Sequence, residues 1–318
     1  FFFLYFFFYI CLYRDYLPFV FIALTRFLKS MSNKKLFLLF SLLITCTFLD
    51  AQNLRCSYMY MYKNKVTDKN YRADPMVLDW DGKCSAFYSE SKFRYDSLSV
   101  LAFDDAGNIK DKDKYRELTT LSGGPLIWNY VDYSKRSFEY VYGFMLETIL
   151  TGGELEMPRW TISDGTEEYL GYVCRRATAD YLGRTWTVLF TEEIPVSIGP
   201  SFLWGTPGLI VYAIDSEQLF CYKLMGVEQV ESSRYSKSRE YAVDLRKYKT
   251  KFDSISHFYE YPFEEAIKFI NRLSSDIDFN YEITGIRTVD HNGRPLKSDP
   301  LFDYIPLIPD EYFNKKQK

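Results

Sequence analysis

The feature that most constrains the fold is an alternation of side chains with a period of two residues. It recurs along the chain, at residues 58–62, 138–142, 172–177 and 184–191. In the last of these segments Trp186, Val188 and Phe190 fall on one side of an extended chain. Successive side chains of a strand point to opposite faces of a sheet, so this period predicts strands that each bury one face. A chain with this many such segments is predicted to be mainly β.

Near residue 210 the chain predicts a hairpin. Residues 209–214 are continuously apolar, which is typical of a strand covered on both faces. Residues 215–218 are polar, and residues 219–227 form the next strand-like segment. We therefore expect two antiparallel strands joined by a turn at residues 215–218.

One segment has the period of a helix. It begins at Pro262, and its apolar residues are spaced three or four apart: Phe263, Ala266, Ile267, Ile270 and Leu273. Pro262 suits the first helical position, and the acidic residues after it suit the positive end of the helix dipole. The spacing predicts an amphipathic helix. Beyond it, Asn292 and Gly293 predict a tight turn, and residues 301–318 read as an extended tail.

The first 51 residues predict a leader. Met31 is followed by two lysines, an apolar run at residues 36–49 and the small residue Ala51. These are the three regions of a secretory signal peptide. We expect residues 31–51 to be this signal peptide and the mature chain to begin at Gln52.

Residues 1–30 have two interpretations, a membrane anchor or the translation of non-coding sequence ahead of the start codon. We favour the second, because Arg14 and Asp15 divide the apolar stretch and a membrane span needs about 20 continuous apolar residues. A further alternative is a lipid anchor on Cys46, which the residues around it fit poorly. We expect contact with a membrane only through the leader.

Residues 52–318 suit one large β domain or two small ones, and their aromatic content supplies an ample core. No repeat or low-complexity linker divides them, so we expect a single domain. The predicted fold class is mainly β. We expect one antiparallel curved sheet, or an incomplete barrel (half-barrel), with one amphipathic helix packed against it near the C-terminus.

The charge balance excludes two kinds of partner. Of the 39 basic and 42 acidic residues, residues 1–51 hold five and two, so residues 52–318 carry 34 basic and 40 acidic side chains. This mild acidic excess gives no electrostatic footprint for nucleic acid. It also argues against a polybasic patch that binds a membrane surface.

Four cysteines follow the leader: Cys56, Cys84, Cys174 and Cys221. Export permits disulfides, and four cysteines allow three pairings. Cys56 and Cys84 are symmetric about Asn70, as cross-strand partners in a hairpin would be, which favours pairing Cys56 with Cys84 and Cys174 with Cys221. Four unpaired cysteines in packed strands are an equal alternative. No Cys-x-x-Cys spacing occurs, so no metal site is expected.

Signatures of common exported hydrolases are absent from the sequence. It contains no Gly-x-Ser-x-Gly, no His-Glu-x-x-His and no phosphate-binding glycine loop. The only histidines are His257 and His291, each with an ordinary explanation as a helix cap or a turn residue. Carboxylates could form a glycosidase pair if the fold brought two together, and the candidates are Asp164, Glu167, Glu192 and Glu193. We expect no catalytic residues and no cofactor.

The central part of the chain resembles a known family. The segments that carry the resemblance are residues 160–164, 170–178, 183–187, 190–196 and 199–210, the last ending in Gly205-Thr206-Pro207-Gly208-Leu209-Ile210. They are similar to the GLPGLI family, which is named after a Gly-Leu-Pro-Gly-Leu-Ile motif. The sequence departs from the family pattern at two places. Thr206 stands where the family usually has Leu, and Leu189-Phe190 stand where it usually has Trp-Tyr. The resemblance implies a signal peptide, a Bacteroidetes-type source and export to the periplasm or outer surface. It implies no particular biochemical role.

The motif precedes the apolar strand at residues 209–214. Pro207 and Gly208 suit the centre of a type II turn, with a positive φ at Gly208. The motif serves either backbone geometry alone or the approach of main-chain N–H groups to a ligand. The tryptophans have a similar ambiguity between core packing and ligand stacking. A binding surface, if one exists, is expected at Arg184, Trp186, Trp204, Gly205, Pro207 and Gly208.

Three functions follow from these observations. Residues 170–174 and 184–187 are similar to paired strands of exported half-barrel carriers of lipid or hydrophobic ligands, a likeness that does not itself fix function. The leading hypothesis is a non-catalytic binding or carrier protein for an apolar small molecule or an envelope protein. The alternatives are an interaction component of an outer-membrane assembly and a hydrolase with an unrecognised site.

Overall fold

The computed structural model describes residues 53–104, 106–121, 124–144, 147–243, 257–287, 289, 291–296 and 305–316. All of them belong to one compact unit, Gln52–Lys318. The predicted signal peptide, residues 1–30 and Cys46 lie outside the described residues. The described strands are β1 (Asn53–Tyr62), β2 (Arg72–Trp80), β3 (Cys84–Ser89), β4 (Ile127–Asp132), β5 (Ser137–Phe144), β6 (Glu147–Glu154), β7 (Thr161–Ile162), β8 (Glu167–Tyr169), β9 (Tyr172–Tyr181), β10 (Arg184–Thr191), β11 (Leu209–Asp215), β12 (Phe220–Val230) and β13 (His257–Glu260). The described helices are α4 (Glu90–Ala102), α5 (Lys112–Leu118), α6 (Tyr235–Val243), α7 (Phe263–Ser275), α8 (Ile277–Thr284) and α9 (Glu311–Lys316).

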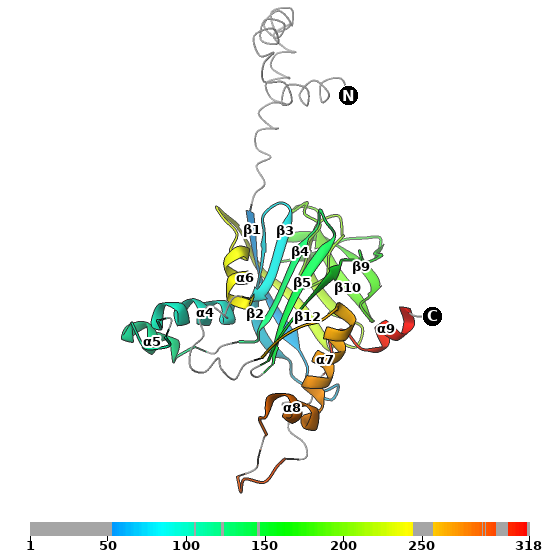
Figure 1. The fold of residues 1–318 in the computed structure, drawn as a ribbon. Helices are drawn as coiled ribbons and strands as arrows, with labels where there is room; N and C mark the ends of the chain where they lie inside the picture. The colour runs from blue at the N-terminus through cyan, green and yellow to red at the C-terminus, as the bar shows by residue number, and fades with distance from the viewer. Residues whose placement is uncertain are drawn as a thin grey trace, which may run out of the picture. The chain divides into compact units, whose positions relative to one another are not determined.

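Within the described part of the chain, thirteen strands form a single sheet (Figure 1). Their order is β13-β6-β5-β4-β3-β2-β1-β12-β11-β10-β9-β7, and β8 also pairs with β9. The pairings are antiparallel except that of β13 with β6, which is parallel and lies at one edge. Across the described residues the two ends of this order do not pair with each other, so the sheet stays open. The predicted fold class is confirmed.

The sheet has an inner face that holds the main core. Tyr58 and Tyr60 of β1 are buried in it, together with Ile149 of β6 and Val188 of β10. β6 and β10 are far apart in the strand order, so their side chains share one core because the sheet curves around it. The predicted side-by-side burial of Trp186, Val188 and Phe190 is confirmed, since their exposed fractions are 4%, 0% and 0%.

Sequence periodicity also placed the hairpin near residue 210 correctly. β11 and β12 pair antiparallel, with Ile214 opposite Cys221. Asp215 fixes the turn between them, because its Oδ1 accepts hydrogen bonds from the main-chain N–H groups of Leu219 and Phe220 at 2.7 and 2.8 Å. These two main-chain donors satisfy one oxygen of the buried carboxylate.

The predicted amphipathic helix is confirmed as α7. Its residues Ala266, Ile267, Ile270 and Leu273 are buried against the inner face, where α7 packs on β5 and β6. Pro262 is the N-cap rather than the first helical residue, because its ψ of 151° is extended. Phe263 therefore begins the helix, and its ring contacts Phe138 of β5 at 4.9 Å between centroids.

Helices α4 and α6 cover part of the outer face and were not predicted. They pack on β2, β3 and β4 around a second core that includes Tyr88, Trp128 and Ala242. The indole N–H of Trp128 donates to Ser238 Oγ of α6 at 2.9 Å. In Figure 1, α4 leads away from the sheet to α5. None of the described helices is long and apolar enough to span a bilayer.

The C-terminal residues 305–316 are more structured than expected. We predicted an extended tail, but Glu311–Lys316 forms α9. Ile308 and Phe313 are buried in the main core, with exposed fractions of 4% and 5%. This burial, together with a cluster of hydrogen bonds to Arg184 described below, supplies the tertiary contact that a short helix needs.

The preferred disulfide pairing is wrong, because the described cysteines, Cys56, Cys84, Cys174 and Cys221, are free. Cys56 lies opposite Leu78 in the β1–β2 hairpin, so the centre of the hairpin is nearer residue 67 than residue 70. Cys84 lies on β3, beyond β2. A cysteine two strands away cannot reach disulfide distance. The alternative of unpaired cysteines in packed strands is the one that the structure has.

Candidate functional site

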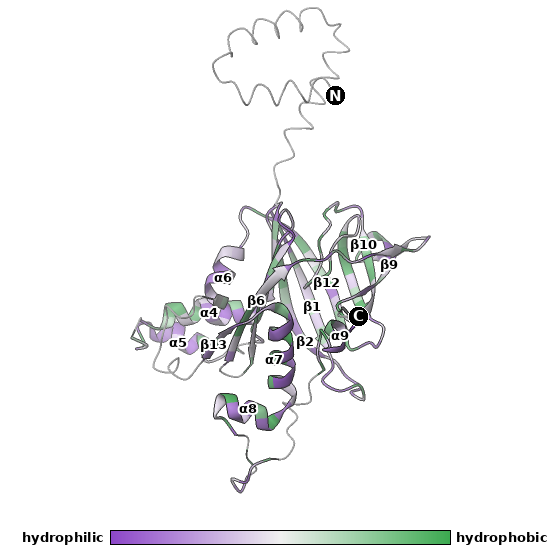
Figure 2. Cartoon of the chain, turned by 45° about the vertical axis from the view of Figure 1, so that its right-hand side comes forward, coloured by the Kyte–Doolittle hydropathy of each residue, from purple (hydrophilic) through white to green (hydrophobic). Residues whose placement is uncertain are grey.

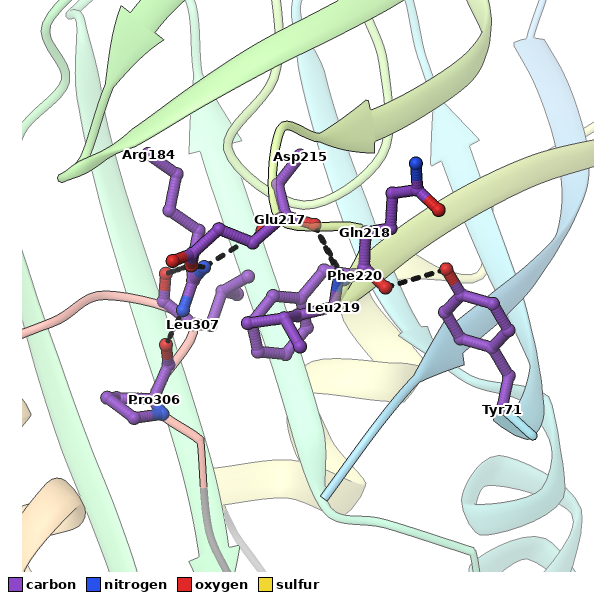
Figure 3. A network of polar contacts seen from close by, with 9 residues as sticks. All are labelled: Tyr71, Arg184, Asp215, Glu217, Gln218, Leu219, Phe220, Pro306 and Leu307. Carbon is purple, nitrogen blue, oxygen red and sulfur yellow. Dashed lines mark hydrogen bonds and ion pairs between the residues drawn. The ribbon is translucent and has the colours of Figure 1, made fainter. Parts of the chain in front are cut away.

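Arg184 connects the end of β10 to the C-terminal segment (Figure 3). Its Nη1 donates to Asp215 Oδ2 at 2.9 Å and to Glu217 Oε2 at 3.0 Å. Its Nε and Nη2 donate to the carbonyl oxygens of Leu307 and Pro306 at 2.9 and 2.5 Å. The guanidinium also lies 4.5 Å from the centre of the Phe220 ring. These contacts use all three nitrogens of the guanidinium group. Arg184 therefore holds the C-terminal segment against the sheet.

Both tryptophans of the predicted site are buried. Trp186 is 4% exposed, and its ring centre lies 6.0 Å from that of Tyr222. Trp204 is 9% exposed, and its indole N–H donates to the Glu156 carbonyl at 3.3 Å. Trp160 in turn donates to the carbonyl of Trp204 at 2.7 Å. These contacts give both side chains a place in the core, and a binding role for them stays a prediction.

The Gly-Thr-Pro-Gly motif is a tight connection between backbone segments. The predicted positive φ at Gly208 is wrong; within the motif it is Gly205 that has one, at 89°. Gly208 is required by a close approach instead, because an added Cβ would lie 1.9 Å from the Thr191 carbonyl oxygen. Thr206 is fully buried and donates to the Gly208 carbonyl at 2.7 Å. Pro207 is exposed.

At least two cavities lie in the described structure, and these two are small. One, of about 10 Å³, lies between Trp186, Phe202 and Ile308 on the inner side. The other, of about 20 Å³, lies between α4, α6 and β4, beside Trp128 and Asp96. A water molecule needs about 10–15 Å³ of such space, and sites for drug-sized ligands measure about 300–1,000 Å³. Neither cavity holds an apolar ligand of that size.

One of the two histidines pairs with a buried carboxylate. His257 begins β13 rather than capping a helix, and its Nδ1 lies 3.2 Å from Glu147 Oε1. The Glu147 side chain is fully buried, while that of His257 is 54% exposed. Burial and the Glu147 carboxylate raise the pKa of the neighbouring Tyr259. A carboxylate that orients an imidazole is one part of a general-base site. His291 lies in the exposed turn before Gly293.

No group of three or more metal-ligating side chains occurs among the described residues. Asp164 is exposed, and the other three candidate glycosidase carboxylates have partners of their own. Glu167 pairs with Arg176 at 2.7 Å and Glu192 with Arg175 at 3.2 Å. Glu193 accepts a hydrogen bond from the Val173 N–H at 2.7 Å. These contacts fasten the ends of strands on the surface.

The outer face of four strands carries an apolar surface that the sequence analysis did not single out. Side chains alternate between the two faces along each strand. Tyr60, Tyr222 and Val188 point into the inner core, so the residues before and after them point outward and form two rows across the strands. We call these two rows the outer patch, and its members are Met59, Met61, Thr187, Leu189, Tyr212, Ile214, Cys221 and Lys223.

The outer patch lies on β1, β12, β11 and β10, and α4 and α6 pack on the neighbouring strands β2, β3 and β4. Figure 2 shows β1, β12 and β10 to the right of α4 and α6. Leu189 and Cys221 are buried among their neighbours, and burial raises the pKa of the Cys221 thiol. The other members are half-buried. Met225 at a bulge of β12 is 59% exposed next to the patch. At the far end Tyr169 contacts Tyr212, with ring centres 6.0 Å apart.

No protein-family model matches the sequence, and a comparison with curated proteins gives no match. Two solved structures of PNGF-II, in the C2 and P21 space groups, have a TM-score of 0.43 and 13% sequence identity to this chain. The aligned part covers 69% of this chain and 33% of PNGF-II. A likeness at this level fixes neither the fold nor the function of this protein.

Proposed function

We propose that this is an exported, non-catalytic binding protein of the GLPGLI type, and that it holds an envelope protein against the outer patch. The observation that carries the proposal is the composition of the patch. Met59, Met61, Tyr212 and Ile214 are half-buried on a sheet face next to strands that helices cover. Large contiguous apolar patches on the surface of a folded protein mark interaction sites.

Side chains of the patch suit a protein partner. Methionine and tyrosine are enriched in protein interfaces, and methionine adapts its shape to the surface it meets. Lys223 is the one charged member of the two rows. Its position between Met59 and Tyr212 gives the patch a single charged contact that orients a partner. Depletion of charge at the centre of an interface is the usual composition.

The carrier form of the leading hypothesis has less support. The inner face is filled by the protein's own aromatic side chains, and the two cavities have room for about one water molecule each. A protein partner needs no cavity. The alternative of an interaction component of an outer-membrane assembly uses the same patch and likewise needs no cavity.

Site-specific photo-crosslinking tests the proposal. A photoreactive phenylalanine analogue replaces Met225 next to the patch, and in a control protein it replaces Val66, which is 72% exposed on the loop between β1 and β2. Irradiation of intact cells is expected to give a protein adduct from position 225 and none from position 66. Adducts of equal yield from both positions, or none from position 225, would contradict the proposal.

The hydrolase alternative has one observation in its favour, the contact between His257 and Glu147. Its test is the turnover of generic ester and glycoside substrates by the protein and by His257→Ala. Turnover that the substitution abolishes would replace the binding proposal with an enzymatic one.

A further inference from the structure

The sheet ends at β6, and β13 covers only half of that strand. The parallel register pairs His257–Glu260 with the first four residues of β6, Glu147 to Leu150. Pro262 then turns the chain into α7. The second half of β6, from Thr151 to Glu154, has β5 on one side and none of the described strands on the other.

Main-chain groups of this second half point away from the sheet. Tyr261 N–H donates to the Leu150 carbonyl at 3.2 Å, so Leu150 faces the outer side of β6. Inward and outward groups alternate along a strand, so Gly152 and Glu154 also present their N–H and C=O groups outward. In the described structure no main-chain hydrogen bond reaches these groups on that side. Both residues are exposed.

This edge has only one of the usual protections against strand addition, the charged side chain of Glu154. Natural sheets block an open edge with lysine, proline, a bulge or a covering segment. Here the residues are Thr151, Gly152, Gly153 and Glu154, and the pairing with β5 is regular along them. An edge of this kind accepts another strand more readily than a protected one.

The two glycines differ in what lies beside them, because an added Cβ at Gly152 would lie 2.7 Å from the Phe138 carbonyl oxygen, whereas Gly153 lies against a side chain. An ideal Cβ at Gly153 would lie 3.4 Å from Cε1 of Phe138, so the ring lies under the position of the missing side chain. On the opposite face Gly152 lies across from Glu139, whose Oε2 accepts a hydrogen bond from Arg239 Nε at 2.9 Å. One face of an added strand would therefore meet an aromatic ring and the other an ion pair.

We propose that this edge of β6 binds an extended segment of another polypeptide by strand addition. Main-chain donors and acceptors at strand spacing are complementary to a polypeptide backbone. The segment carries an apolar side chain beside Gly153, where it extends the aromatic cluster of Phe138, Phe202 and Phe263, and polar residues on the other face. This site is separate from the outer patch and does not depend on it.

Peptide binding to the purified protein tests the proposal. The probe is a fluorescent peptide, Lys-Thr-Phe-Thr-Phe-Thr-Lys, and its control is the same peptide with N-methyl groups on alternate amides, which removes the donors and keeps the side chains. Fluorescence anisotropy is expected to show binding of the first peptide and none of the second. Absence of binding by the first, or equal binding by both, overturns the proposal.

A pair of variants locates the binding. Glu154→Pro removes an outward N–H and no hydrogen bond inside the sheet, because proline is tolerated on an edge strand at such a position. Glu154→Thr keeps the N–H and is the matched control. We expect Glu154→Pro to weaken binding by about tenfold or more, since it loses a hydrogen bond and adds a steric block, and Glu154→Thr to bind as the parent does.

Circular dichroism checks that both variants keep the sheet. Equal weakening by the two variants would place the peptide elsewhere and overturn the assignment to β6. A dimer of the protein itself that Glu154→Pro dissociates, without peptide binding, would also overturn it, because the occupant would then be a second copy.

Discussion

Replacing Gly208 by alanine should strongly destabilise the protein. The added Cβ would lie 1.9 Å from the carbonyl oxygen and 2.6 Å from the carbonyl carbon of Thr191. Carbon atoms do not approach closer than 3.0 Å in such contacts, so the start of β11 has to move by more than 1 Å from the end of β10. Both neighbouring atoms are main chain and cannot rotate away. Overpacking costs about 1–3 kcal/mol, and occasionally more when the backbone has to shift.

We expect about 3 kcal/mol, the upper part of that range, because the hydrogen bond from Thr206 to the Gly208 carbonyl is disturbed as well. For a domain of this length each kcal/mol lowers the melting temperature by about 2–4 °C, so the expected loss is about 6–12 °C. Gly226→Ala is the matched control. It lies in β12, and an added Cβ there meets nothing within 4 Å.

Urea unfolding followed by tryptophan fluorescence and circular dichroism measures both variants against the parent. Gly226→Ala is expected to stay within about 0.5 kcal/mol of the parent. If Gly208→Ala unfolds at the same urea concentration as Gly226→Ala, the close approach of β10 and β11 is not what requires glycine in the motif.

Three further predictions concern the polar and thiol groups. Arg184→Met should lower the free energy of unfolding by about 3–5 kcal/mol, because it leaves Asp215 buried without its cation. Hydrogen exchange should also rise in residues 305–316, and unchanged exchange there would refute the role of Arg184 in holding this segment. Hydrogen bonds from Ser134 lower the pKa of Asp132 from 3.8 to about 2, so its stabilising effect is present above pH 3.8 and is lost as the pH falls toward 2. The difference in unfolding midpoint between the parent and Asp132→Asn should shrink over this interval, and a constant difference would contradict the assignment. Burial raises the pKa of Cys56 to about 12, so iodoacetamide should alkylate it only after unfolding, and labelling of the folded protein would refute this burial.

The strands could be predicted because their alternation is local. In β1 the tyrosines point inward and the methionines outward, and the sequence shows this alternation without any knowledge of the partners. The same holds for Trp186, Val188 and Phe190 in β10. The helix α7 was predictable for a similar reason, since its buried residues repeat every three or four positions.

Other elements depend on contacts that the local sequence does not contain. In α4, Glu90–Ala102, apolar and polar residues are distributed around the helix, because one part of it packs on β2 and β3 and another part on α5. β13 is four residues long and exists through its pairing with β6. Gly208 was assigned to a turn because Pro-Gly is a common turn dipeptide, whereas its requirement comes from Thr191, which is 17 positions away in the sequence.

The candidate site was the least predictable part. The sequence shows that both faces of residues 58–62 are apolar, but it does not show which face α4, α6 or α7 covers. The outer patch becomes visible only when the register places Met59 beside Lys223 and Tyr212. Conversely, Trp186 and Trp204 were singled out by residue type, and their burial depends on segments that are distant in the sequence.

The central claim, that the protein binds another protein rather than a small molecule, is tested most directly by native mass spectrometry. The protein is purified from the cells that produce it without reducing agent, and its native mass is compared with its mass after denaturation. We predict a complex that exceeds the denatured chain by the mass of a second, different polypeptide. A chain that carries only a small apolar molecule, released on denaturation, would contradict the claim and support a carrier instead.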